Sequence, residues 1–150
     1  MTIHLDTSVV LAATLQDEGI HDHARAAVLA LRHHGHFHAA DILPQELTNG
    51  LSRVVRRGRL DAAAARRALD FWLDQPWTWH PVFPHCATAL NDCATGHGHA
   101  YDLLHLHTAH AQGARLLTAD QAFIASAHRH PQRRTVLLLG EAKTLAVLKK

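Results

Sequence analysis

The sequence predicts an α/β fold in which a mostly parallel central sheet is covered by helices on both faces. Short apolar runs alternate along the chain with longer stretches whose apolar residues recur at helical spacing. In addition, 47% of the 150 residues are hydrophobic, which excludes a disordered chain and is enough for one core. Strands that alternate with helices form right-handed βαβ units, so the sheet should be mostly parallel. Since no repeat or linker divides the chain, residues 1–150 are expected to form a single domain.

The predicted strands are short runs rich in apolar residues. They cover residues 3–5, 36–40, 77–82, 115–118 and 135–139. Val9, Val10 and Leu11 are read together with the first strand, which ends near Asp6. The predicted helices have apolar residues three and four positions apart. They cover residues 22–34, 42–57, 62–74, 85–95, 100–112 and 121–128.

Local signals support the boundaries of two of these helices. Asp41 is a suitable N-cap for the helix at 42–57, and Pro44 falls in its first turn, where proline is tolerated. Gly50 lies within the same helical pattern and is expected to allow close contact with another helix. Asp61 is expected to cap the helix that follows.

Histidine dominates the polar composition, with 16 residues against 15 Lys and Arg and 13 Asp and Glu. The formal charge is +2 at pH 7 with neutral histidines, so the net charge depends strongly on pH just below neutrality. His36 and His38 face the same side of a predicted strand and could share a Zn²⁺ ion. No cysteine or third ligand accompanies them, so we expect most of the histidines to lie on the surface.

Several classes of protein are excluded. No apolar run approaches the about 18 residues of a transmembrane helix, and residues 1–6 lack the basic region of a signal peptide. Cys86 and Cys93 are seven positions apart in one predicted helix, which separates them by about 10 Å, too far for a disulfide. We therefore expect two free thiols that take part in packing, and a cytoplasmic location.

The scarce acidic residues occupy informative positions. Asp6 follows the first strand and Asp120 follows the strand at 115–118, so both should lie at the carboxyl edge of the sheet. Glu46 and Asp102 lie in the first turns of two predicted helices, whose starts cluster at the same edge. Four carboxylates at one point repel each other, and an all-oxygen site suits Mg²⁺ or Mn²⁺. Alternatively, the four acids are helix caps and solvated surface residues.

Four short motifs around these acids resemble those of PIN-domain proteins, in order and in spacing. They are Leu5-Asp6-Thr7-Ser8-Val9-Val10-Leu11-Ala12, Pro44-Gln45-Glu46-Leu47-Thr48-Asn49-Gly50-Leu51, Tyr101-Asp102-Leu103-Leu104 and Leu117-Thr118-Ala119-Asp120. The resemblance spans nearly the whole chain and implies a PIN-like three-layer α/β/α sandwich. The compact length is similar to that of the VapC-like toxins of prokaryotic toxin–antitoxin pairs, which are Mg²⁺-dependent endoribonucleases.

The resemblance also implies a role for each residue of the site. The metal ligands that it implies are the three aspartates of these motifs, Asp6, Asp102 and Asp120. Glu46 would hold a metal-bound water or assist its deprotonation, while Ser8 and Thr118 would orient the carboxylates. The implied cofactor is Mg²⁺, with Mn²⁺ as a substitute. The implied partners are an RNA substrate, a cognate antitoxin and a second copy of the chain, with no membrane.

Two further groups are candidates for contacts with RNA or with the antitoxin. His105 lies one helical turn after Asp102, where it would line the groove and bind phosphate when protonated. The alternative is a surface histidine without a role. Six arginines fall within fifteen residues, and guanidinium groups suit phosphate and carboxylate. The arginines chosen as candidates are Arg53, Arg56 and Arg57, which otherwise form a solvated face.

Other interpretations stay open at this point. Trp72, Trp77 and Trp79 are expected to pack in the core or in a dimer rather than to stack on bases. One rival function is a non-catalytic PIN-fold module that binds nucleic acid together with its antitoxin. A second rival is a phosphatase with Asp6 as its nucleophile, although the second acid that many such enzymes carry two residues further on is missing.

Overall fold

The centre of the protein is a five-stranded sheet in the order β3–β2–β1–β4–β5. The computed structural model describes residues 2–33, 35 and 37–148. The strands are β1 (Ile3–Leu5), β2 (Phe37–Ala40), β3 (Trp77–His80), β4 (Arg115–Thr118) and β5 (Val136–Leu138). Each pair of neighbouring strands is parallel, which confirms the predicted parallel sheet.

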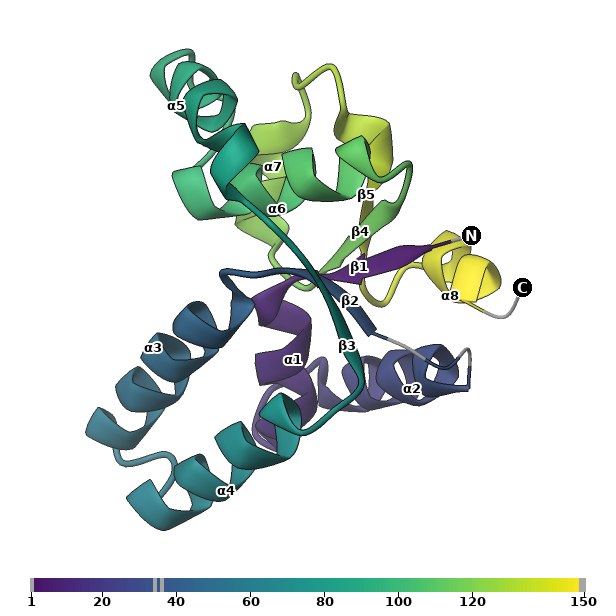
Figure 1. The fold of residues 1–150 in the computed structure, drawn as a ribbon. Helices are drawn as coiled ribbons and strands as arrows, with labels where there is room; N and C mark the ends of the chain where they lie inside the picture. Colours follow the sequence, from purple (N-terminus) through teal and green to yellow (C-terminus); the bar gives the residue numbers. More distant parts are fainter. Residues whose placement is uncertain (1, 34, 36, 149–150) are drawn as a thin grey trace.

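Helices cover the sheet on both sides (Figure 1). Helices α1 to α4 lie on one side of the sheet and helices α5 to α7 on the other. The bounds are α1 (Thr7–Thr14), α2 (His21–Arg32), α3 (Leu43–Arg56), α4 (Ala62–Leu73), α5 (Cys86–Ala94), α6 (Ala100–Ala111), α7 (Gln121–Ala127) and α8 (Ala142–Leu148). Two single 3₁₀ turns, η1 (Phe83–His85) and η2 (Arg133–Thr135), complete the structure. The predicted three-layer α/β/α sandwich is confirmed.

The sheet is buried on both faces, as a parallel sheet must be. On one face Leu5 and Leu117 pack with residues of α1 and α2. On the opposite face Leu116 packs with Leu103 and Leu106 of α6. Consequently β1 and β4, the strands that precede Asp6 and Asp120, are fixed from both sides.

The sequence interpretation misses two helices. It places Val9, Val10 and Leu11 with the first strand, whereas α1 begins at Thr7, directly after β1. Val9 and Val10 are both fully buried on α1, because this helix packs against both α2 and α3. A helix that is apolar on several sides gives the same short apolar run as a buried strand. Helix α8, which packs beside α2, is also missing from the prediction.

Gly50 lets α3 approach α1, as predicted. A Cβ atom at this position would lie 2.7 Å from Leu11 Cδ1, so a larger residue would displace Leu11 or the helix. The predicted cap at Asp61 is also confirmed, because its Oδ1 accepts the Ala64 N–H at 2.7 Å. The predicted cap at Asp41 is wrong. Its Oδ1 instead accepts the Val82 N–H at 3.1 Å and links the start of α3 to the segment after β3.

The aromatic and sulfur-containing residues divide between the core and the surface. Trp72 is buried and its Nε1–H donates to Thr14 Oγ1 at 2.8 Å, which confirms its place in the core. Trp77 is half-buried and stacks on Trp79, which is exposed. Both cysteines are free, as predicted, but Cys86 is exposed and does not pack in the interior.

None of the helices within the described ranges combines the length and the apolar composition that crossing a bilayer requires.

Candidate active site

Asp6 is held at the carboxyl end of β1 by two hydroxyl groups. Its N–H donates to Leu117 O on the neighbouring strand at 2.9 Å. Ser8 Oγ donates to Asp6 Oδ2 at 2.6 Å, and Thr118 Oγ1 donates to the same oxygen at 2.5 Å. Asp6 precedes α1 without capping it through its side chain, so its second oxygen, Oδ1, is available to the site. The structure therefore places Ser8 and Thr118 where the sequence analysis expects them, beside the carboxylate of Asp6.

Asp120 is positioned by the same hydroxyl groups at the end of the adjacent strand β4. Its N–H donates to Thr118 Oγ1 at 3.0 Å, while the Ala119 N–H donates to Ser8 Oγ at 2.9 Å. Asp120 Oδ1 accepts the Phe123 N–H at 2.9 Å and so caps α7. One carboxylate oxygen of Asp120 thus serves the helix, and the other is left for the site.

Glu46 reaches the site from α3, on the other side of Asp6. Thr7 Oγ1 donates to Glu46 Oε2 at 2.7 Å, and His105 Nε2 contacts the same oxygen at 2.6 Å. Burial raises the pKa of Glu46, but the hydrogen bond and the charge of His105 outweigh this effect and lower it overall. Glu46 is therefore held as a carboxylate at the edge of the site.

The pKa of Asp102 reflects the charges of the other three acids. Burial is the main reason that its pKa is raised to about 7, and the negative charges of Asp6, Asp120 and Glu46 add to the effect. The positive charge of His105 opposes it. The four acids therefore lie close enough to interact, as expected from their positions in the sequence, and the alternative holds in part, because Asp120 also caps α7.

His105 differs from both readings of the sequence. Only 1% of the residue is exposed, so it neither lines the groove as a phosphate ligand nor lies on the helix surface. Burial lowers its pKa, but the hydrogen bond to Glu46 and the charges of Asp6, Glu46 and Asp102 raise it overall. Its Nε2 also lies 3.9 Å from Asp6 Oδ1. Helical spacing places His105 on the face of Asp102, but it does not show that this face is turned toward the sheet.

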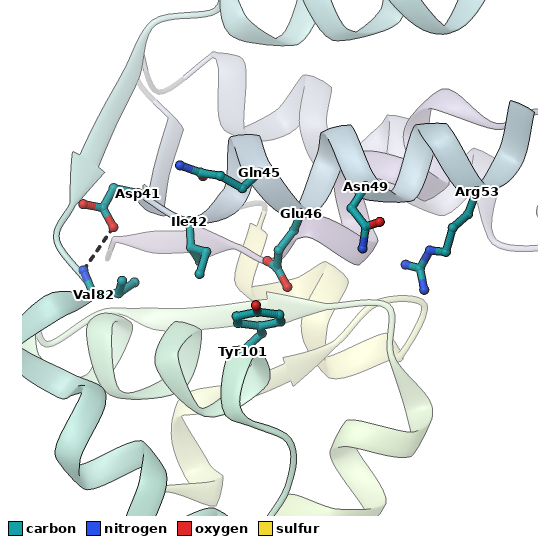
Figure 2. A pocket seen from close by; sticks show the side chains of 8 residues that line it. All are labelled: Asp41, Ile42, Gln45, Glu46, Asn49, Arg53, Val82 and Tyr101. Atoms are coloured by element: carbon teal, nitrogen blue, oxygen red, sulfur yellow. Dashed lines mark hydrogen bonds between the residues drawn. The ribbon is translucent and has the colours of Figure 1, made fainter. Parts of the chain in front are cut away.

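A groove of about 730 Å³ opens beside Glu46 (Figure 2). Arg53 and Asn49 follow Glu46 along α3, and Tyr101 of α6 faces Glu46 across the groove. Tyr101 stands next to Asp102 in the sequence and is 56% exposed, so it is accessible to a ligand in the groove. The sequence analysis gives no role to Tyr101 or to Thr7, although both stand directly beside a predicted acid.

The arginine cluster divides into free and paired side chains. Arg53 lines the groove, whereas Arg56 and Arg57 are exposed near the end of α3. Arg59 is bound to Asp17 and Glu18, and Arg66 is bound to Asp70. No ion pair found within the described residues involves Arg53, Arg56 or Arg57, so these three arginines are available for a partner.

The donor set fits a divalent cation. Ligand atoms of Asp6, Glu46 and His105 lie within 4.8 Å of one another, and the charges of Asp6, Asp120 and Glu46 add to the burial that raises the pKa of Asp102. Oxygen ligands of this kind suit Mg²⁺ and Mn²⁺ better than softer metals. The residues that could share such an ion are the four acids, with Ser8 and Thr118 fixing the orientation of Asp6.

Comparison with known proteins identifies the family of this chain. The family model of the PIN domain matches residues 3–128. The chain is 34% identical over 118 residues, covering 79% of this chain and 85% of the relative, to VapC ribonuclease Mb0985 of Mycobacterium bovis and to ribonuclease VapC9 of Mycobacterium tuberculosis. A crystal structure of VapBC2 from Rickettsia felis bound to a promoter DNA fragment has a similar fold. Its TM-score is 0.62 at 20% identity, over 88% of this chain and 95% of that one. The protein therefore belongs to the PIN domain family and is a VapC-like member of it.

Proposed function

We propose that this protein is a Mg²⁺-dependent endoribonuclease and the toxin of a toxin–antitoxin pair. The observation that carries the proposal is the convergence of four carboxylates: burial, together with the negative charges of the other three acids, raises the pKa of Asp102 to about 7. Four carboxylates attract a divalent cation, whereas without a cation they repel the phosphodiester anion of RNA. The names of the VapC ribonucleases and of the VapBC2 complex support the activity and the antitoxin, and a cytoplasmic location belongs to the same proposal.

The side chains have separate tasks in this reaction. Asp6, Asp102 and Asp120 would hold the ion, which supplies charge neutralisation, a lowered pKa for water and stabilisation of the phosphodiester. Ser8 and Thr118 hold Asp6 Oδ2, so Oδ1 is the oxygen left to bind the ion. Thr7 and His105 both bind Glu46 Oε2, which leaves Oε1 to accept the proton of the attacking water.

Removal of divalent ions tests the proposal directly. We expect EDTA to abolish cleavage of total RNA, and Mg²⁺ or Mn²⁺ to restore it, because the acids alone repel a phosphodiester. Mapping of fragment ends by sequencing measures the activity. Cleavage that persists in EDTA would contradict the metal requirement. Binding of RNA without cleavage would favour the non-catalytic module, and hydrolysis of a small phosphomonoester alone would favour the phosphatase.

His105 is proposed as a positioning residue for Glu46. In His105→Leu the pKa of Glu46 should rise, since burial then acts without the opposing hydrogen bond and charge. Glu46 is then protonated to a larger extent at pH 6 than at pH 8, so the loss of cleavage should be greater at pH 6. The pH–rate profile measures this, with His110→Leu on the same helix as the control. Profiles of the same shape for His105→Leu and the unchanged protein would show that His105 does not act through Glu46.

Arg53, Arg56 and Arg57 are proposed to bind the RNA backbone or the antitoxin. For RNA, the Arg56→Ala/Arg57→Ala variant should bind less tightly, and the slope of log K against log salt should fall by about 1.4, since two phosphate contacts are lost. Fluorescence anisotropy at several salt concentrations measures the slope. Arg66→Ala/Arg67→Ala on α4 is the matched control. An equal loss of slope in both variants would show that the three arginines are not a specific surface.

The expected homodimer belongs to the same proposal. Light scattering of the purified protein with and without its antitoxin measures the number of copies in each state. A monomer under both conditions would remove the dimer from the proposal and leave the activity untouched.

A further inference from the structure

Three histidines lie side by side on one face of the sheet, on three neighbouring strands. His4 of β1 is the register partner of His38 on β2. His80 of β3 is the register partner of Ala40, which shares a face with His38 because the two are two residues apart. The zinc pair that the sequence allows at His36 and His38, against the favoured expectation of surface histidines, includes His36, which lies outside the described residues. His38, however, does belong to a histidine cluster, with partners from other strands.

The spacing of the three rings matches a metal site. His38 Nδ1 lies 3.2 Å from His80 Nε2, and one ring nitrogen from each histidine lies within 4.8 Å of the other two. Tetrahedral Zn²⁺ with Zn–N bonds of about 2.0–2.1 Å places its nitrogen ligands about 3.3 Å apart and their ring centres about 5 Å apart. The ring centres here are separated by 4.5, 5.5 and 5.9 Å. The ring planes are inclined by 18–31° to one another, so the distances fit one ion once the rings rotate about their side-chain bonds to direct one nitrogen each at it.

The buried ring of His4 is independent support for a bound ion. Only 1% of this residue is exposed, and neither of its ring nitrogens has a hydrogen-bond partner among the described residues. A buried polar side chain without a partner is unfavourable, so native proteins seldom leave one. The rings of His38 and His80 lie beside the ring of His4. An ion bound between the three rings would satisfy His4.

A second histidine cluster lacks this feature. His107 Nε2 and His130 Nε2 both lie within hydrogen-bond distance of Asp92 Oδ2, at 2.8 and 2.9 Å. The Gln132 N–H donates to His130 Nδ1 at 3.0 Å, so the proton of neutral His130 is on Nε2 and that nitrogen cannot bind a metal. The Asp92 cluster is therefore satisfied by its own hydrogen bonds, and it serves as the comparison in the experiment below.

We propose that His4, His38 and His80 form a site for one transition-metal ion, with Zn²⁺ as the ion that fits the ligands best. Neutral imidazole suits Zn²⁺, whereas the carboxylates of the active site suit Mg²⁺. His38 and His80 are half-buried, which gives the ion a path from solvent and leaves a coordination position for water. The ion would join the edge strand β3 to the central strand β1.

Cobalt binding tests this proposal without any measurement of RNA cleavage. The full chain, freed of metal with EDTA and then kept in excess Mg²⁺ to occupy the acidic site, is titrated with Co²⁺. We expect one equivalent to give the visible absorption band of tetrahedral Co²⁺, and Zn²⁺ to displace it. Zn²⁺ should also raise the melting temperature by about 5 °C or more.

Substitutions locate the ion. His80→Gln and His38→Gln, each checked for folding by circular dichroism, should bind Co²⁺ at least about a hundredfold more weakly, since each removes a ligand. His23→Gln, an exposed histidine of α2, and His130→Gln of the Asp92 cluster should keep the band. Absence of the band in the unchanged protein would overturn the proposal. So would a band that survives in both His38→Gln and His80→Gln, or one that is lost only in His130→Gln. If neither variant folds, a melting temperature that Zn²⁺ does not raise overturns it instead.

Discussion

Replacing Asp6 by asparagine should reduce RNA cleavage by about a thousandfold or more while the protein stays folded. The loss follows because a bound divalent ion supplies several kcal/mol of transition-state stabilisation, and Asp6 is its central ligand in the proposed site. The amide oxygen of asparagine can still accept the hydroxyl hydrogens of Ser8 and Thr118. Removal of one of the repelling charges should leave the melting temperature unchanged or higher.

The same variant has a readout that is independent of catalysis. The negative charge of Asp6 helps to raise the pKa of Asp102, so this pKa should fall in Asp6→Asn. A carboxyl titration followed by NMR measures it. Asp74→Asn, at the exposed end of α4, is the matched control and should change neither cleavage nor titration. Full cleavage by Asp6→Asn would refute the assigned site, and an unchanged pKa of Asp102 would refute the coupling between the acids.

Lowering the pH from 7 to 5 in the presence of EDTA should cost about 2 kcal/mol of folding stability through His4 alone. Burial, followed by the nearby His80, His38 and His105, lowers the pKa of His4 from 6.5 to about 3. The unfolded chain therefore gains a proton at pH 6.5 that the folded chain does not, so this stabilisation is present above pH 6.5 and is lost as the pH falls. His107, whose pKa burial also lowers, acts in the same direction.

The comparison with His4→Leu isolates this contribution. His105 acts in the opposite direction, because its raised pKa favours the folded state at low pH, but it does so in both proteins. Urea unfolding at pH 7 and at pH 5 gives the free energy of unfolding for each. The decrease between the two pH values should be about 2 kcal/mol smaller in His4→Leu than in the unchanged protein. Equal decreases would mean that His4 is protonated in the folded state.

Much of the fold can be predicted from the sequence because local patterns determine it. Alternation of apolar runs and helical stretches identifies all five strands and six of the helices, and the caps at Asp61 and Asp120 occur at residues that favour caps. Since parallel strands end at one edge, the positions of Asp6 and Asp120 after two strands predict that both lie at that edge. Whether they are neighbours there depends on the strand order, which the pairing of β1 with β4 supplies.

The parts that cannot be predicted depend on which face of an element is turned inward. Spacing places His105 near Asp102, but the packing of α6 against the sheet is what buries His105 and directs it to Glu46. His4, His38 and His80 are 34 or more residues apart in the sequence, so only the register of β1, β2 and β3 shows that they meet. Asp41 has the residue type of a cap, yet a backbone N–H from a distant segment competes for its side chain.

The pairing of the first strand with the fourth has a consequence for the synthesis of the protein. His4 pairs with Leu116, and the hydrogen bond from Thr118 to Asp6 joins residues 112 positions apart. A chain still growing on the ribosome has β1 and Glu46 early, but it lacks the strand that holds Asp6 and the residue that completes the acidic site, Asp120. The unpaired edge of β1 stays open until that point. The four proposed site residues therefore come together only after Asp120 has been synthesised and β4 has paired with β1.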